Sequence, residues 1–206
     1  MKDQKKMIVV GISGASGPIL GIRLIEELLN SGEKVAAIVS KSASQIIEYE
    51  ILQGKSPFSS LKDLLATRGL SGNHDLLSEF KNNDFFAPVA SGSTKFQAMV
   101  VIPCSMKTLS AIVHGYADSL ITRTCDVALK ERRRCIIVPR ETPLSVVHTG
   151  NIHRAALAGI EIVPPVPGFY TRPESVDDVV NFVVGKVLNL LGFDHDLFES
   201  WGKKEL

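Results

Sequence analysis

Short apolar runs alternate along the chain with longer segments in which apolar residues recur at helical spacing. Residues 7–12 (MIVVGI) are an unbroken apolar run, which predicts a strand buried on both faces of a sheet. A glycine-rich turn follows, and helical periodicity then extends from Pro18 to Asn30. Residues 34–40 (KVAAIVS) predict a second strand. This order of strand, turn, helix and strand predicts a βαβ unit.

The same alternation returns in the second half of the chain. Further strands are predicted at 98–103, 135–139 and 161–163, and further helices at 42–50, 105–117, 118–133, 143–158 and 176–191. Strands that alternate with helices favour a mostly parallel sheet with helices on both faces. The predicted fold class is therefore α/β, as one Rossmann-like domain over residues 1–206.

Two segments depart from the regular pattern. Gly, Ser, Asn and Pro are frequent in residues 54–84, where only Leu61 to Leu65 predict a short helix. No long apolar pattern lies inside this segment, so we predict an irregular excursion that covers the site or contacts other copies, and not a second domain. Residues 192–206 are predicted to be a C-terminal tail.

Composition and charge narrow the class of protein. The formal net charge is +1, whereas nucleic-acid-binding proteins usually carry a clear basic excess, so we expect no nucleic-acid partner. The polar start of the chain and the absence of about 20 consecutive apolar residues predict neither a signal peptide nor a membrane span. Three cysteines without a CxxC pair argue against a disulfide framework. A reducing, cytoplasmic location is the expectation.

Small polar or charged residues follow every predicted strand. Ligands of open parallel α/β sheets bind outside the carboxyl ends of the strands. The segments at these ends are Ser13–Gly17, Ser40 with Lys41, Cys104–Thr108, Arg140–Pro143, and residues 164–172 with Tyr170. Their convergence predicts a ligand site at this edge of the sheet.

The first of these turns has the composition of a phosphate-binding turn. Glycines at 11, 14 and 17 allow a ligand to approach the backbone, and free N–H groups at a helix start attract a phosphate. The spacing is not GxGxxG, and Ser40 stands where a dinucleotide site would place an acidic residue. A mononucleotide such as FMN therefore fits better than NAD. A tight turn that binds no ligand is the alternative.

The other strand ends each allow two interpretations. Ser105 and Thr108 either bind a ligand or cap a helix, and Cys104 has the character of a small buried residue more than of a nucleophile. Arg140 can hold a phosphate through two parallel hydrogen bonds, and Glu141 can act as a general acid or base. The alternative for this pair is an ion pair at the surface.

Three further features have ordinary explanations beside the functional ones. The charged run that begins at Lys130 is typical of a solvated helix end. Lys186, in an apolar helix, either extends to the surface or contacts a phosphate. The histidines show no metal-ligand spacing, so no metal is assigned.

Eight motifs together carry a resemblance that covers nearly the whole chain. They are GISGASG (11–17), VSKSA (39–43), ASGS (90–93), PCSMKTLS (103–110), ALKERR (128–133), VPRETP (138–143), PPVPGFY-x-RP (164–173) and Trp201. In this order they resemble the UbiX/Pad1-type flavin prenyltransferases.

The resemblance implies a flavodoxin-like fold and a homododecamer. It also implies a metal-independent enzyme that binds reduced FMN and dimethylallyl phosphate and joins the dimethylallyl group to N5 and C6 of the flavin. The product, prenylated FMN, would serve a UbiD-type decarboxylase, in ubiquinone biosynthesis or in decarboxylation of aromatic acids.

The resemblance also implies roles for individual residues. Glu141 resembles the family's acid/base, and Ser16 resembles a hydroxyl placed near flavin N5. The implied substrate-binding residues are Arg123, Lys130, Tyr170 and Lys186. The implied cofactor-binding residues are Gly14, Ala15, Ser16, Ser40, Ser105, Met106, Lys107, Thr108 and Arg140.

Two positions depart from the family pattern. Lys186 stands where the family commonly has Arg, which replaces a planar two-point grip on phosphate by a point charge. Phe85 stands where some members have Trp, and its ring can still shield an allyl cation. A flavin-dependent cysteine decarboxylase and a non-catalytic flavin carrier are the alternative functions.

Overall fold

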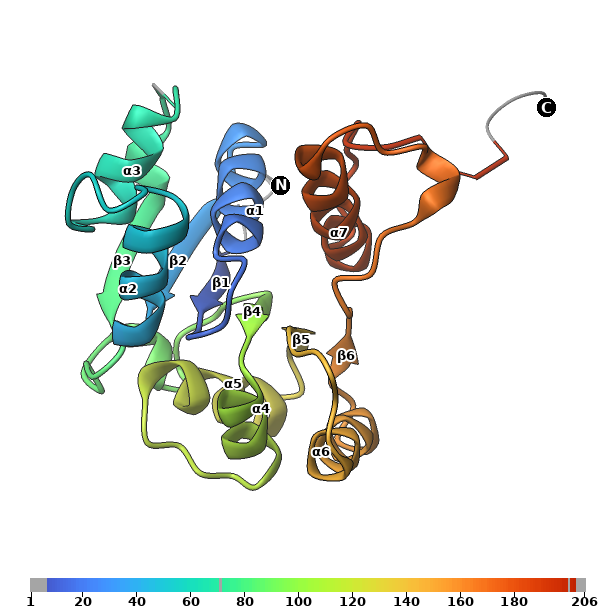
Figure 1. The fold of residues 1–206 in the computed structure, drawn as a ribbon. Coiled ribbons are helices and arrows are strands. Elements are labelled where there is room, and N and C mark those ends of the chain that lie inside the picture. Colours follow the sequence, from blue (N-terminus) through green and yellow to red (C-terminus); the bar gives the residue numbers. More distant parts are fainter. Residues whose placement is uncertain (1–6, 71, 200, 203–206) are drawn as a thin grey trace, which may run out of the picture.

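The parallel sheet predicted from the sequence is present in the computed structural model, which describes residues 7–70, 72–199 and 201–202 (Figure 1). Within these residues, six strands are ordered β3-β2-β1-β4-β5-β6, and every neighbouring pair is parallel. The strands are β1 Met7–Ile12, β2 Lys34–Val39, β3 Leu77–Lys81, β4 Ala98–Cys104, β5 Arg134–Pro139 and β6 Glu161–Ile162. The predicted α/β fold class is thus confirmed.

Helices cover both faces of the sheet (Figure 1). One face carries α1 Ile19–Asn30, α2 Lys41–Glu50, α3 Leu61–Thr67 and α7 Val176–Leu191, and the other carries α4 Met106–Val113, α5 Leu120–Lys130 and α6 Val146–Leu157. Alternate residues of the central strands enter the two cores: Ile8 and Val10 face the α1 side, and Val9 faces the α4 side. This two-sided burial explains why the strands are continuous apolar runs.

The excursion over residues 54–84 contains regular structure that the sequence analysis did not predict. Strand β3 lies there and extends the sheet beside β2, with Leu77 opposite Val35. Without β3 the remaining strands follow the flavodoxin-like order 2-1-3-4-5. The prediction missed β3 because only Leu77 of its five residues (LSEFK) is buried, as is usual for an edge strand.

Several helix boundaries differ from the predicted ones. Helices α4, α5 and α6 are shorter than predicted, and α5 and α6 begin at serine caps, Ser119 and Ser145. Each cap hydroxyl accepts a hydrogen bond from the backbone N–H three residues later. Ser175 caps α7 in the same way, as predicted.

Some predicted features lie outside the described residues. These are most of the Lys-rich start, residues 1–6, and residues 200 and 203–206 of the predicted tail. None of the helices in the described part of the chain is long and apolar enough to cross a membrane.

Candidate functional site

A buried serine joins the turns that follow β1 and β4. The Ser13 hydroxyl donates a hydrogen bond to the carbonyl oxygen of Pro103 (2.9 Å) and accepts one from the N–H of Ser105 (2.8 Å). The Ser13 N–H also donates to the Pro103 carbonyl (3.2 Å). Sequence reasoning placed Ser13 in the first turn but gave it no role. In the structure it aligns that turn with the start of α4.

Backbone hydrogen bonds bring two more strand ends to the same place. The N–H of Ser40 donates to the carbonyl of Ile12 (3.0 Å), and the N–H of Arg140 donates to the carbonyl of Cys104 (3.1 Å). The turns after β1, β2, β4 and β5 therefore lie side by side. This is the convergence that the parallel order predicted for the first turn, Ser40, Ser105 and Arg140.

The first turn packs so closely that one of its glycines has no room for a side chain. A Cβ at Gly14 would lie 2.6 Å from the Cβ of Ser42 in α2. Gly17 has a φ of +90°, and its N–H donates to Oε2 of Glu50 (2.9 Å). Because the Gly17 N–H binds a carboxylate oxygen, this turn can donate hydrogen bonds to an anion, as helix starts do.

Sequence reasoning missed Glu50. It is the last residue of α2, and the short-range pattern contains no signal for its contact with a turn 33 residues earlier. Its exposed carboxylate places a second acid near the strand ends, in addition to Glu141.

Ala15 and Ser16, the remaining residues of the first turn, differ in their hydrogen bonds. Ala15 is buried, and its N–H donates to the carbonyl of Ser13 (2.8 Å). Ser16 is half-buried, and its hydroxyl has no hydrogen-bond partner within the described residues. That hydroxyl is therefore free to meet a ligand.

Two of the predicted site hydroxyls are helix caps. Ser40 Oγ accepts from the N–H of Ala43 (3.1 Å), and Ser105 Oγ accepts from the N–H of Thr108 (3.2 Å). The hydroxyls of Ser105 and Thr108 are also hydrogen-bonded to each other (2.9 Å). The capping interpretation of Ser105 is thus confirmed, and it fixes the position of this turn at the strand ends.

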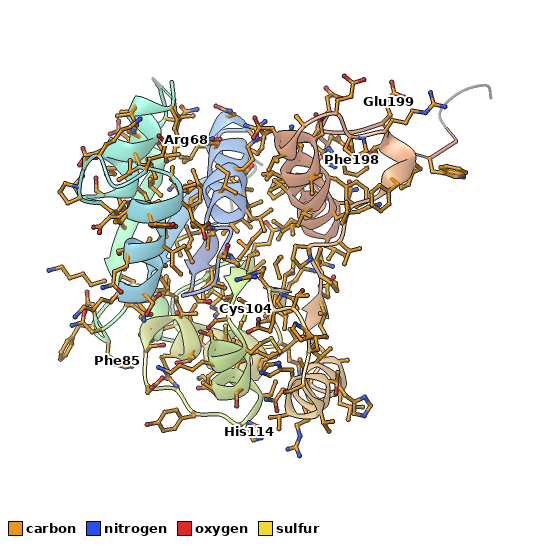
Figure 2. The ribbon with its side chains drawn as sticks, viewed as in Figure 1. Arg68, Phe85, Cys104, His114, Phe198 and Glu199 are labelled. Carbon is orange, nitrogen blue, oxygen red and sulfur yellow. The ribbon has the colours of Figure 1, made fainter. Side chains whose placement is uncertain are left out.

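The two remaining residues of the turn after β4 have different environments. Met106 is buried in the core on the α4 side, whereas Lys107 is exposed. Lys107 borders a surface hollow of about 370 Å³, whose other lining residues are Ser110, Ala111, His114, Tyr116 and Asp118. His114, the C-cap of α4, is labelled in Figure 2.

Arg140 presents an unused donor at the strand ends. Its Nε is buried and has no hydrogen-bond partner among the described residues. Leaving a buried charged donor unpaired is costly, so its position favours an external acceptor such as a phosphate oxygen. Glu141 beside it is exposed, and its Oε1 accepts from the N–H of Thr142 (3.0 Å). No ion pair joins Arg140 to Glu141 among the described residues, so the alternative of a surface ion pair is not observed.

Arg123 and Lys130 gather around the loop that carries the ASGS motif. Arg123 Nε donates to the carbonyl of Ala90 (3.1 Å), and its guanidinium pairs with Asp126 (2.6 Å). Lys130 pairs with Glu131 (3.1 Å) beside Gly92. Both cations therefore lie against the loop 90–93, and each is paired with a neighbouring carboxylate.

The charged run after α5 is more than a solvated helix end. Arg133 donates to the carbonyls of Gly92 and Thr94 (2.6 Å each) and lies 4.4 Å from the centre of the Phe96 ring. Arg134, the first residue of β5, pairs with Glu161, the first residue of β6 (2.8 Å). The contacts of Arg133 tie the loop around Gly92 to the start of β5.

Tyr170 and Lys186 belong to a separate cluster. Tyr170 lies in the 3₁₀ turn Phe169–Thr171. The segment between β6 and α7, residues 163–175, forms an arm that projects on the side of α7 away from α1 (Figure 1). Its ring contacts Phe182 and Trp201, and the Lys186 ammonium lies over the ring of Phe182. Among the described residues of one copy, the aromatic and cation contacts of these two residues are with this cluster and not with the first turn.

Phe85 lies in the loop that follows the carboxyl end of the edge strand β3. It is 47% exposed, at the outer edge of the molecule, whereas Cys104 lies at its centre (Figure 2). Cys104 is buried, and burial raises the pKa of its thiol far above the ordinary value. This supports the interpretation of Cys104 as a small buried residue.

Among the described residues, no group of three or more His, Cys, Asp or Glu side chains has the geometry to hold a metal ion.

Comparison with known proteins gives a family match over most of the chain. The profile of the Flavoprotein family matches residues 1–188. A curated relative, the flavin prenyltransferase UbiX of Methanocaldococcus jannaschii, is 47% identical over 195 residues, which are 95% of this chain and 98% of the relative.

Solved structures give the same result. The crystal structure of AnUbiX (PadA1) in complex with FMN and dimethylallyl pyrophosphate superposes with a TM-score of 0.84 at 39% identity, and covers 98% of this chain and 100% of its own. A dodecameric FMN-dependent UbiX-like decarboxylase from Escherichia coli O157:H7 superposes with a TM-score of 0.80 at 40% identity, over 92% of this chain and 96% of its own.

Proposed function

The chain belongs to the Flavoprotein family and, within it, to the UbiX flavin prenyltransferases, and from this premise we propose that it prenylates reduced FMN. The proposed reaction joins the dimethylallyl group of dimethylallyl phosphate to N5 and C6 of the flavin. The observation that carries the proposal is the buried Nε of Arg140, beside Glu141, which has no hydrogen-bond partner in the part of the chain that the structure describes. It lies at strand ends that are hydrogen-bonded to the glycine-rich turn.

In this proposal the converging turns hold FMN, which supplies the electron-rich atoms for alkylation. Backbone N–H groups of Gly14 and Ser16 offer donors for its phosphate, and Ala15 holds the turn between them through its own bond to the Ser13 carbonyl (2.8 Å). Arg140 offers the charged donor of its Nε. The other binding residues are Ser40, Ser105, Met106, Lys107 and Thr108. The flavin's electronic properties belong to the cofactor, and the protein orients it.

Glu141 is the proposed proton carrier. Its carboxyl protonates the phosphate that leaves when the C–O bond of the prenyl donor breaks, and its carboxylate then accepts the proton lost from C6. Glu141 gives one proton and takes one, so it ends as it began. The proton that N5 loses on alkylation balances the proton that the prenyl double bond gains when C6 bonds to it. Its exposed side chain, next to Arg140, allows it to reach both groups once ligands fill the site.

Fixed cations would stabilise the departing phosphate. Arg123 and Lys130 around Gly92, and Lys186 with Tyr170 on the arm, are the proposed ligands of the prenyl phosphate. Preorganised positive groups of this kind stabilise developing negative charge without needing a metal ion.

The proposed phosphate ligands around Gly92 and those near the arm lie on different parts of one copy. We therefore propose that the complete site lies between copies in a homododecamer. In support, the arm projects from the body of the chain (Figure 1). Phe169 of the arm and Trp201 of the C-terminal tail are about four-fifths exposed (78% and 81%). The proposed acceptor of the product is a UbiD-type decarboxylase.

Anaerobic incubation with reduced FMN and dimethylallyl phosphate, followed by mass spectrometry of the released flavin, tests the proposal. The expected result is a mass gain of one C5 unit that is lost in Glu141→Gln, while FMN affinity stays within about twofold. FMN that is bound but never alkylated, by either the monophosphate or the pyrophosphate, would contradict the proposed function. Full activity in Glu141→Gln would contradict the role of that residue.

A further inference from the structure

The C-terminal tail completes an aromatic cluster on the outer face of α7. The ring of Phe198, from the tail, packs against Phe182 of α7 with ring centres 5.0 Å apart. Phe198 is labelled beside α7 in Figure 2. Tyr170 meets Phe182 edge-on at 5.8 Å, and Trp201 meets Tyr170 edge-on at 5.4 Å. Such tilted and edge-on pairs are favourable arrangements of aromatic rings.

The ammonium group of Lys186 lies over two of these rings. Its Nζ is 5.3 Å from the centre of the Phe182 ring and 5.2 Å from the centre of the Phe198 ring. Both distances are within the range of about 6 Å in which a ring face attracts a cation. None of the ion pairs between described residues includes Lys186. The two rings are therefore its partners, and its N–H donors are left for an anion.

Two glycines allow the rings to approach this closely. A Cβ at Gly185 would lie 2.5 Å from Phe198 and 2.7 Å from His195, so the tail rests directly on the helix backbone. A Cβ at Gly168 would lie 2.5 Å from Phe182. The position of Phe198 beside Lys186 thus depends on the bare backbone of α7 at the preceding residue.

We propose that Phe182 and Phe198 are positioning residues that hold the Lys186 ammonium in place for the phosphate of the prenyl donor. This inference rests on the proposed function. A free lysine side chain loses rotamer freedom when it binds an anion, and it lacks the planar, preorganised fork of arginine. Two ring faces that already confine the ammonium and exclude water reduce that loss. The two rings thereby offset the weaker preorganisation of a lysine, compared with an arginine, at this position.

The test measures binding without turnover. Dimethylallyl phosphate is titrated calorimetrically into the oligomeric protein loaded with oxidised FMN, in which no alkylation occurs. Phe198→Leu removes the ring and keeps an apolar side chain, and we expect the Kd to rise about three- to tenfold. Phe198→Tyr keeps a ring face and should restore the affinity. Phe58→Leu is the matched control, because Phe58 is also partly buried but lies in the loop before α3.

A double-mutant cycle separates positioning from general support of the fold. Lys186→Met should itself weaken binding, and Phe198→Leu should then cause no further loss, because the ring acts through the ammonium. The same additional loss in both backgrounds, or an unchanged Kd in Phe198→Leu, would overturn this inference. Both results leave the proposed function standing. If the wild-type protein binds FMN but no prenyl phosphate, the proposed function fails, and this inference fails with it.

Discussion

Replacing Ser13 by alanine should loosen the junction between the first turn and α4. The substitution removes one oxygen atom from a residue that is 1% exposed. The Pro103 carbonyl loses the hydroxyl donor at 2.9 Å but keeps the Ser13 N–H at 3.2 Å. The Ser105 N–H loses its acceptor at 2.8 Å, in a place where the packed turns leave little access for water.

The size of the effect follows from these contacts. A buried donor without a partner costs about 1–3 kcal/mol, and the small volume of one oxygen adds little. For a chain of 206 residues, 1 kcal/mol corresponds to a change in melting temperature of about 2–4 °C. We therefore expect Ser13→Ala to lower the melting temperature by about 2–12 °C, and to weaken FMN binding because the Ser105 turn is displaced.

Thermal unfolding with and without FMN, at matched protein concentration, measures both effects. Ser44→Ala is the control, because the Ser44 hydroxyl donates a hydrogen bond to the Ser40 carbonyl one turn earlier, at the start of α2 (3.3 Å). Loss of this hydroxyl should change the free energy of unfolding by less than about 0.5 kcal/mol. An unchanged melting temperature in Ser13→Ala would refute the reasoning, since it would mean that the Ser105 N–H needs no acceptor from Ser13.

Three further predictions concern other parts of the fold. Gly21→Ala should lower the free energy of unfolding, measured with denaturant, by about 1–3 kcal/mol, because the new Cβ would lie only 2.3 Å from the Ile102 carbonyl oxygen. The helix propensity of Ala acts in the opposite direction, and a variant as stable as wild type would contradict the prediction. Hydrogen bonds, first from the Ser175 side chain, lower the pKa of Asp178 below its ordinary value of 3.8, so its stabilisation is present above about pH 4 and is lost as the pH falls through the lowered pKa. The difference in melting temperature between wild type and Asp178→Asn should therefore shrink on acidification, and a difference that does not depend on pH would refute the capping role. Burial raises the pKa of the Cys104 thiol, so iodoacetamide at pH 8 should label it only after unfolding, and rapid labelling of the native protein would show that the site opens.

Much of the fold was predictable from local pattern. The apolar run of β1, the helical periodicity of α1 and α7, and the caps Ser105 and Ser175 all appear where the sequence indicates them. Burial on two faces produces continuous apolar strands, and unpaired N–H groups at a helix start select serine. Both effects act within a few residues, so a single sequence records them.

The meeting of the strand ends was predictable as well, because it follows from parallel order alone. Only residues that directly follow a predicted strand could be placed there from the sequence, and these are Ser40, Ser105 and Arg140. Strand β3 was not predictable, because most of its residues are at least partly exposed, and its structure depends on pairing with β2.

The sequence by itself determined the alternation of strands and helices, the glycine-rich turn and the motifs of the family. Only the tertiary structure decided that Ser13 links two turns 90 residues apart, that Glu50 reaches Gly17, and that Phe198 lies over Lys186. The physical reason is the range of the interactions. Periodicity and capping are properties of neighbouring residues, whereas each of these contacts forms only once the sheet and its helices have packed and brought distant segments together.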